Sequence, residues 1–255
     1  MKKQEGIRGF TLFIYKNIYT LDICILFRIL FISSLVVCLV FPGLAGSTSN
    51  GSLECVSEPV ILLTGFVPFG SISENPSELV VRELQNTTVD GCCIYGLVLP
   101  VDFTGSVEAM MPIVDSLHPV LILSLGLEAQ AHEVHIETLA FNLKKDPSAS
   151  GSESRLQRID PEGSFFYSSS LPLRSIVHDL RVSRIPVRQS VFAGTYVCNT
   201  VFYSTLKYLA DHDEAIPAGF VHLPLLDSQD SQGLNLSTLV EAVRTILHTS
   251  LVKNT

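Results

Sequence analysis

The sequence predicts an α/β protein with three layers, in which helices cover both faces of a mostly parallel sheet. From residue 59 onward, short and continuous apolar runs alternate with segments of helical periodicity. Strands that are apolar along their whole length are typical of a parallel sheet that is buried on both faces. Their alternation with helices is typical of βαβ units. A chain of 255 residues that is 47% hydrophobic can bury one substantial core.

The first 46 residues differ from the rest of the chain. Several basic residues precede an uncharged apolar run at 29–45, and small residues follow it. This order is typical of a secretory signal peptide or a signal anchor, although Arg28 interrupts any longer apolar span. A wrongly assigned start of the protein is the alternative. Residues 47–58 are rich in Ser and Gly and are predicted to be a linker to one domain at 59–255.

The first predicted strand is Val60–Thr64, an apolar run that ends at Gly65. A helix is then predicted to begin at Asn75. Its side chain can cap the helix, Pro76 suits the first helical position, and Glu78 can reach back to the cap.

Two more strands are predicted at Cys92–Leu99 and Val120–Leu125. Apolar residues at helical spacing lie between them, at 107–117, and Pro112 is expected to kink or shorten this helix. Val134–Leu143 is predicted to form one further strand, and a polar, irregular surface segment follows it as far as Gly163.

In the second half of the chain, helices and strands are again predicted to alternate. The predicted elements are a helix at Leu173–Val182, a strand at Val187–Phe192, a helix that begins near Cys198, a strand at Gly219–Leu223, and a C-terminal helix whose apolar stripe includes Leu239, Val243 and Ile246.

The charge and the cysteine pattern exclude several classes of function. The net charge is −8 and the body of the chain has no basic cluster, which argues against nucleic acid as a partner. The six cysteines include no Cys-x-x-Cys pair. His132 and His135 are three residues apart in a strand-like segment, whereas a zincin needs histidines four apart on a helix. We therefore expect no metal and no other cofactor.

The candidate chemistry depends on a cysteine and a histidine. Cys198 lies where an amphipathic helix is predicted to begin, so the unpaired N–H groups and the dipole of the helix would favour a thiolate there. His222 lies near the end of a predicted buried strand, and an imidazolium beside a thiol favours the thiolate further. A buried structural cysteine and a core histidine are the alternatives. Together the two residues predict a cysteine-dependent hydrolase.

A catalytic histidine is usually oriented by an acceptor. Glu137, within an apolar strand-like segment, is a candidate, because a buried carboxylate needs a partner. The alternative is a surface charge on an edge strand. Asp227 follows His222 closely, but no motif gives it the orienting role.

Four separated segments, in the same order, resemble the pyroglutamyl peptidase I family of cysteine peptidases. They are Leu63–Gly70 followed by Asn75-Pro76-Ser77, Glu137 with Ala140-Phe141-Asn142, Ala193–Asn199, and Gly219–Pro224. The resemblance extends from Val60 to about Val252 and implies a three-layer α/β/α fold.

This resemblance implies a thiol protease, an omega-peptidase that removes an N-terminal pyroglutamyl residue from peptides. Cys198 would be the nucleophile, His222 the general base and then the acid, and Glu137 a carboxylate of the site. Phe66 and Phe69, in the turn after the first strand, look like the phenylalanines that pack on the pyroglutamyl ring; ordinary core packing is their alternative.

The sequence also departs from the family. Bacterial members usually carry an Arg shortly before the glutamate, where Ala131 and His132 stand here, and many carry a Gln where Leu127 stands. A catalytically reduced binding protein of the same fold is therefore the alternative function. The leader predicts the secretory pathway or a membrane tether, and is the one segment expected to contact a membrane. A cytoplasmic location, usual for the family, is the alternative, and the oligomeric state is left open, a homo-oligomer included.

Overall fold

The computed structural model describes residues 59–145 and 155–253, all of which belong to one compact unit. The predicted leader and linker lie outside the described residues. No described helix combines the length and the apolar character that a membrane crossing requires.

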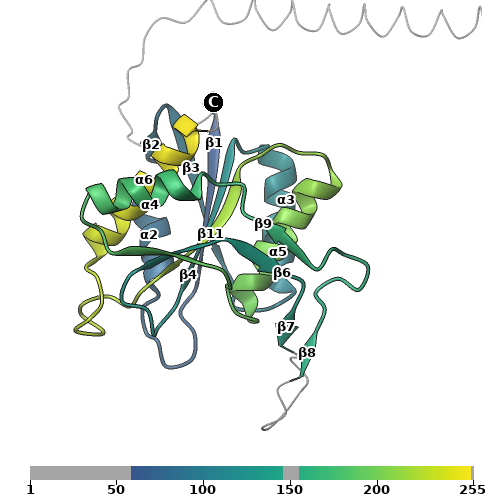
Figure 1. Cartoon of the computed structure of the whole chain (residues 1–255), viewed down its shortest axis with the longest axis horizontal. Coiled ribbons are helices and arrows are strands. Elements are labelled where there is room, and N and C mark those ends of the chain that lie inside the picture. Colours follow the sequence, from purple (N-terminus) through teal and green to yellow (C-terminus); the bar gives the residue numbers. More distant parts are fainter. Residues whose placement is uncertain (1–58, 146–154, 254–255) are drawn as a thin grey trace, which may run out of the picture. The chain divides into compact units, whose positions relative to one another are not determined.

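A seven-stranded sheet forms the centre of the fold, in the order β10-β5-β11-β4-β1-β3-β2 (Figure 1). Four of its six neighbouring pairs are parallel, whereas β5 is antiparallel to β11 and β2 to β3. The strands are β1 (Val60–Phe66), β2 (Thr88–Val89), β3 (Cys92–Leu99), β4 (Leu121–Leu127), β5 (Val134–Glu137), β10 (Val187–Ser190) and β11 (Ala218–Leu223).

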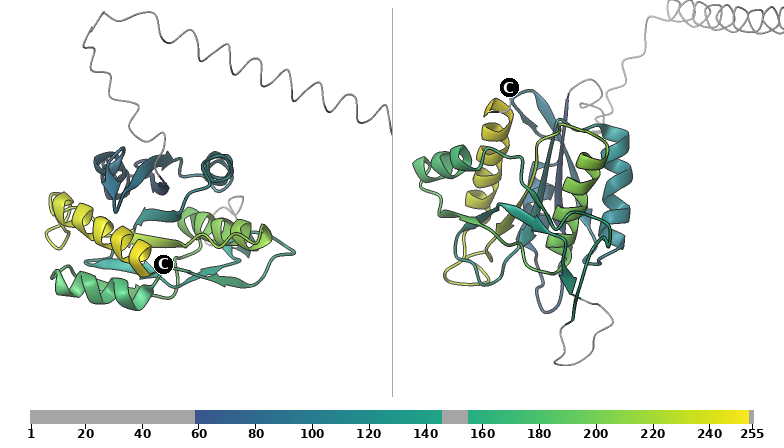
Figure 2. Two further views of the ribbon diagram at one scale, coloured as in Figure 1. Left: turned by 90° about the horizontal axis from the view of Figure 1, so that it is seen from above. Right: turned by 45° about the vertical axis from the view of Figure 1, so that its right-hand side comes forward.

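Helices cover both faces of this sheet, which confirms the predicted three-layer α/β class (Figures 1 and 2). Their bounds are α2 (Pro76–Leu84), α3 (Gly105–Leu117), α4 (Leu173–Val182), α5 (Val197–Asp211) and α6 (Leu236–Lys253). In Figure 1, α2, α4 and α6 lie to the left of the sheet, and α3 and α5 lie to the right. The fold therefore has two hydrophobic cores, one on each face of the sheet.

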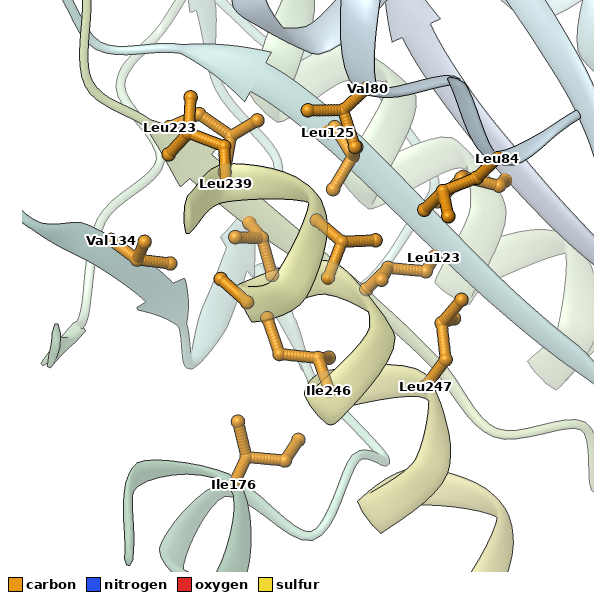
Figure 3. Packing of buried hydrophobic residues seen from close by; sticks show 14 of the residues in the cluster. Val80, Leu84, Leu123, Leu125, Val134, Ile176, Leu223, Leu239, Ile246 and Leu247 are labelled. Atoms are coloured by element: carbon orange, nitrogen blue, oxygen red, sulfur yellow. The ribbon is translucent and has the colours of Figure 1, made fainter. Parts of the chain in front are cut away.

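The larger core lies under α2, α4 and α6. Figure 3 shows side chains of α6, among them Leu239, Ile246 and Leu247, in one cluster with Leu123 and Leu125 of β4. All five side chains are fully buried. The C-terminal helix therefore contributes to the core through the apolar stripe that the sequence predicts.

The helix after β1 begins as expected, with one difference. The side chain of Asn75 accepts a hydrogen bond from the N–H of Ser77 (3.0 Å), and Pro76 takes the first helical position. Glu78, however, does not reach back to the cap but accepts a hydrogen bond from Arg82 (Nε to Oε1, 2.8 Å). An i,i+4 ion pair on the helix surface thus replaces the second half of the predicted capping box.

Pro112 does not shorten α3, which continues through it to Leu117. Pro112 has no N–H to donate to the carbonyl of Glu108. Glu108 is exposed, so its carbonyl can bond water instead. Of the two expected effects of Pro112, a kink or a shortened helix, the shortening does not occur.

The predicted strand at Val134–Leu143 is two strands. The chain leaves the central sheet after Glu137, where the N–H of Thr138 bonds the carbonyl of Ser190 at the end of β10 (2.7 Å). Residues Leu139–Phe141 then form β6, which pairs with β9 (Phe166–Ser168) in a separate small sheet. The segment predicted to be irregular also contains a pair of two-residue strands, β7 (Lys144–Lys145) and β8 (Leu156–Gln157).

Candidate active site

Cys198 is the second residue of α5, as the sequence predicts. The residue before the helix, Tyr196, does not cap it with its side chain. The first N–H groups of a helix have no partner within the helix, and Cys198 lies in this first turn. Cys198 is partly exposed, so a reagent or substrate can reach the thiol.

A glycine makes room for this sulfur. Gly126 of β4 lies opposite His222 in the parallel pairing of β4 with β11. A Cβ atom at position 126 would lie 2.9 Å from Cys198 Sγ and 2.9 Å from Phe220 Cζ, closer than such atoms approach in proteins. Any side chain larger than that of glycine would therefore displace the thiol or the ring.

His222 and Glu137 meet across two neighbouring strands. In the antiparallel pairing of β5 with β11, His222 lies opposite His135. Residues two apart on a strand share a face, so Glu137 lies diagonally from His222 on the same face of the sheet. The imidazole Nδ1 and the carboxylate Oε1 are 2.8 Å apart.

His222 also hydrogen-bonds Cys198, and this contact completes a chain from the sulfur through the imidazole to the carboxylate. Burial of His222 by itself would lower its pKa. The hydrogen bonds and the attraction to Cys198 and Glu137 outweigh burial and raise the pKa of His222 to about 10. The site therefore favours the protonated imidazole, which is the form that pairs with a thiolate.

Glu137 is not a surface charge. Its strand, β5, lies between β10 and β11 rather than at an edge, and the residue is 1% exposed. Its second oxygen, Oε2, is buried and has no hydrogen-bond partner among the described residues. Asp227, by contrast, is exposed. Glu137, rather than Asp227, therefore contacts the imidazole of His222.

The sulfur and the imidazole line a small cavity of about 140 Å³. Phe66, Phe69 and Leu127 form part of its apolar wall. Phe66 is buried at the last position of β1, not in the turn that follows it, while Phe69 is 37% exposed. The remaining lining residues are Asn75, Val101, Glu128, Ala193, Gly194, Tyr196 and Val197.

A second group of polar side chains lies in a cleft that Glu137 also lines. His135 is buried, and its Nε2 accepts a hydrogen bond from Arg188 Nε (2.8 Å); Arg188 also pairs with Glu133 (3.3 Å). Burial and the nearby guanidinium lower the pKa of His135, so this imidazole is held neutral. These residues line a cleft of about 530 Å³ together with Glu137 and Ala131. Arg188 thus places a cation in the same cleft as Ala131 and His132, the segment in which the resemblance leads us to expect an Arg.

Asn199 holds the helix that carries the sulfur against the segment that follows Glu137. Its side chain donates to the carbonyls of Phe141 (2.7 Å) and Leu143 (2.8 Å) and accepts from the N–H of Phe141 (3.0 Å). Asn199 is fully buried. These three bonds hold the first turn of α5 against the end of β6.

Sequence reasoning missed the structural parts played by Gly126 and Asn199. A glycine inside a strand pattern marks a close approach of another group, and this signal was present at Gly126. Asn199 is a polar residue in the first turn of an apolar helix face, which is a signal for a buried hydrogen-bonding site. Among the described residues, no group of three or more His, Cys, Asp and Glu side chains could hold a metal ion.

Comparison with known proteins identifies the family. The model of the pyroglutamyl peptidase family matches residues 60–252. The chain is 34% identical over 203 residues to the pyrrolidone-carboxylate peptidase of Cupriavidus taiwanensis, an alignment that covers 76% of this chain and 93% of the relative.

Solved structures agree with this match. The pyrrolidone carboxyl peptidase of Thermococcus litoralis superposes with a TM-score of 0.72 at 26% identity, covering 77% of this chain and 94% of that one. Pyroglutamyl peptidase I of Bacillus amyloliquefaciens superposes with a TM-score of 0.70 at 28% identity, covering 76% and 98%. This chain belongs to the pyroglutamyl peptidase family.

Proposed function

We propose that this chain is a cysteine omega-peptidase that hydrolyses the bond after an N-terminal pyroglutamyl residue, with Cys198 as nucleophile. The observation that carries the proposal is the contact series from Cys198 through His222 to Glu137 at the wall of a small apolar cavity. Family membership supplies the reaction class, and the geometry supports the roles that we propose for the residues.

In the first half of the reaction, the thiolate of Cys198 attacks the carbonyl carbon of the pyroglutamyl residue. The negative charge moves to the carbonyl oxygen, where the backbone N–H groups at the start of α5 can stabilise it. Protonated His222 then gives its proton to the leaving amine, the C–N bond breaks, and the thioester acyl-enzyme remains.

In the second half, water replaces the released peptide. Neutral His222 takes a proton from this water, whose oxygen attacks the thioester carbonyl. The C–S bond breaks, pyroglutamate leaves, and the thiolate–imidazolium pair is restored. Glu137 holds the imidazole through Nδ1 and stabilises its charged form in both halves.

The cavity supports a small, uncharged ring as the group that binds. Its volume of about 140 Å³ has room for a five-membered lactam but not for a long side chain. Phe66 and Phe69 supply apolar walls for the ring, as the family resemblance implies. A binding protein without activity is less well supported, since nothing in its role requires the buried pair of Glu137 and His222.

The test is hydrolysis of a pyroglutamyl–aminocoumarin substrate by the purified chain and by Cys198→Ala. We expect release of the fluorophore by the wild-type chain and none above background by the variant. Iodoacetamide should alkylate Cys198 and abolish the activity in parallel. Equal rates in the two proteins would refute the proposal. Cleavage of an ordinary aminopeptidase substrate, but not the pyroglutamyl one, would assign a different hydrolase.

A further inference from the structure

One row across the sheet carries Arg188, His135 and His222 side by side. Arg188 of β10 lies opposite His135 of β5, and His135 lies opposite His222 of β11. Residues that are directly opposite in a sheet direct their side chains to the same face. The next member of the row is Gly126 of β4, which lies next to the sulfur of Cys198. The row therefore places His222 between His135 and the sulfur.

The carboxylate of Glu137 lies on the same face and can attract either histidine. Its Oε1 contacts His222 Nδ1 (2.8 Å), whereas Oε2 is buried and has no hydrogen-bond partner among the described residues. His135 is buried two residues before Glu137 on β5. A positive charge on His135 would be attracted to this carboxylate and would repel an imidazolium at His222.

Arg188 opposes such a charge in two ways. Its Nε donates a hydrogen bond to His135 Nε2 (2.8 Å). A protonated imidazole has no free nitrogen lone pair, so this bond requires a neutral His135 with its proton on Nδ1. The guanidinium is also always charged, and it repels a second cation beside it. Burial and Arg188 together lower the pKa of His135.

Charged and titratable groups surround His135 on several elements. They are Arg188 from β10, His222 from β11, Glu133 and Glu137 from its own stretch of chain, and Glu128 and His132 from the loop before β5. The carboxylates of Glu133 and Glu137 favour a charged imidazole. Without the guanidinium, these carboxylates would therefore promote protonation of His135.

We propose that Arg188 is a positioning residue that keeps His135 neutral. A neutral His135 does not compete with His222 for the carboxylate of Glu137. Because His222 lies between His135 and the sulfur, a cation at His135 would destabilise the imidazolium of His222 more than it would stabilise the thiolate of Cys198. The inference rests on the proposed function, since the thiolate–imidazolium pair that it preserves carries out the proposed reaction.

The first test is Arg188→Met, which removes the cation and the hydrogen-bond donor but keeps an apolar stem. The side chain of Arg188 is 55% exposed, so the fold should tolerate this change. In the variant, His135 can take up a proton as the pH falls below 6.5, its ordinary pKa. Relative to wild type, kcat/KM for the pyroglutamyl–aminocoumarin should fall by about 3- to 10-fold at about pH 5.5. At about pH 8.5, where His135 is neutral in both proteins, the loss should be less than about 2-fold.

A second substitution separates this role from a purely structural one. His135→Gln replaces the imidazole with an amide that cannot take up a proton. At about pH 5.5, Arg188→Met combined with His135→Gln should therefore regain kcat/KM to within about 2-fold of wild type. A loss that persists in the double variant, equal losses at both pH values, or no loss at either would overturn the inference. Arg82→Met, on the exposed surface of α2, is the matched control and should not change the pH dependence.

The charge of His135 can also be measured without substrate. Its imidazole nitrogen chemical shifts are assigned by their absence from the spectrum of His135→Gln. At about pH 5.5 they should show a neutral ring protonated on Nδ1 in wild type and a charged ring in Arg188→Met. A charged His135 in wild type would overturn the inference whatever the activity. If His135 responds as expected but no cleavage depends on Cys198, the proposed function fails and the effect of Arg188 on His135 stands.

Discussion

At the scale of single residues, the site shows how a buried imidazole is kept charged. His222 is 3% exposed, and burial alone favours its neutral form. Its contacts with Cys198 and Glu137 reverse this preference and raise its pKa to about 10. His135, on the same face, has no comparable acceptor, and its pKa is lowered by burial and by Arg188. The two buried histidines, which are partners across β5 and β11, thus differ in charge: His222 is protonated and His135 is neutral.

We predict that Glu137→Gln lowers kcat by about 10²- to 10⁴-fold, since a neutral amide no longer stabilises the imidazolium. One cause that raises the pKa of His222 is removed, so the basic limb of the pH–rate profile should move to lower pH. A pH series of kcat and kcat/KM measures both effects, with Glu133→Gln as the control. An unchanged profile would exclude Glu137 from the chemistry.

The same variant should also change how stability depends on pH. The pKa of His222 is raised on folding, from its ordinary value of 6.5 to about 10. Its protonation therefore stabilises the fold fully below about pH 6.5, and this stabilisation is lost as the pH rises toward 10. The difference in unfolding free energy between wild type and Glu137→Gln should then be larger at pH 6 than at pH 10. A difference that does not vary with pH would contradict the raised pKa.

At the scale of elements, strand pairing brings Glu137 and His222 together. In the antiparallel pairing of β5 with β11, His222 lies opposite His135. Glu137 lies two residues further along β5, on the same face as His135, and therefore diagonally from His222. The helix α5 then brings Cys198 over the glycine of β4. No single element carries all the residues of the site. The site forms only where β5, β11 and α5 meet.

We predict that Gly126→Ala lowers kcat/KM by at least about 10-fold, because its methyl group would displace Cys198 Sγ from the imidazole. The same overpacking against Phe220 should cost about 1–3 kcal/mol of stability. Kinetics and urea unfolding measure the two effects. Gly105→Ala, at the first position of α3, is the control and should leave kcat/KM unchanged. Full activity in Gly126→Ala would show that the sulfur tolerates the added methyl group.

At the scale of the whole molecule, the site and the larger core lie on opposite faces of the sheet. Cys198 packs against the core under α3 and α5, whereas the side chains of α6 fill the core on the other face (Figure 3). The stability of the fold and the proposed reaction therefore depend largely on different side chains.

We predict that Ile246→Ala, in the middle of α6, lowers the free energy of unfolding by about 2–5 kcal/mol, since Ile246 is fully buried. The kcat of the folded variant should stay within about 2-fold of wild type, because distant sites act nearly independently. Val182→Ala, at a position that is 70% exposed, is the control and should cost less than about 0.5 kcal/mol. A large loss of kcat in folded Ile246→Ala would mean that the two faces are coupled.

The sequence by itself determined the α/β class, the order of the main helices and strands, and the candidate residues Cys198, His222 and Glu137. Apolar periodicity and capping residues are local, so they can be read without the fold; the α4 helix at Leu173–Val182 has the predicted bounds. The division of Val134–Leu143 could not be predicted in this way, since one strand-like segment contributes β5 to the central sheet and β6 to a separate sheet, and the partner strands of both are distant in sequence.

Only the tertiary structure decided which acid faces His222. Glu137 and Asp227 are both carboxylates, and their distances along the chain favour Asp227, which is five residues away. The pairing of β5 with β11 instead places Glu137 at 2.8 Å and buries it. Strand pairing joins residues that are far apart in sequence, and no local pattern specifies the partner strand or its register.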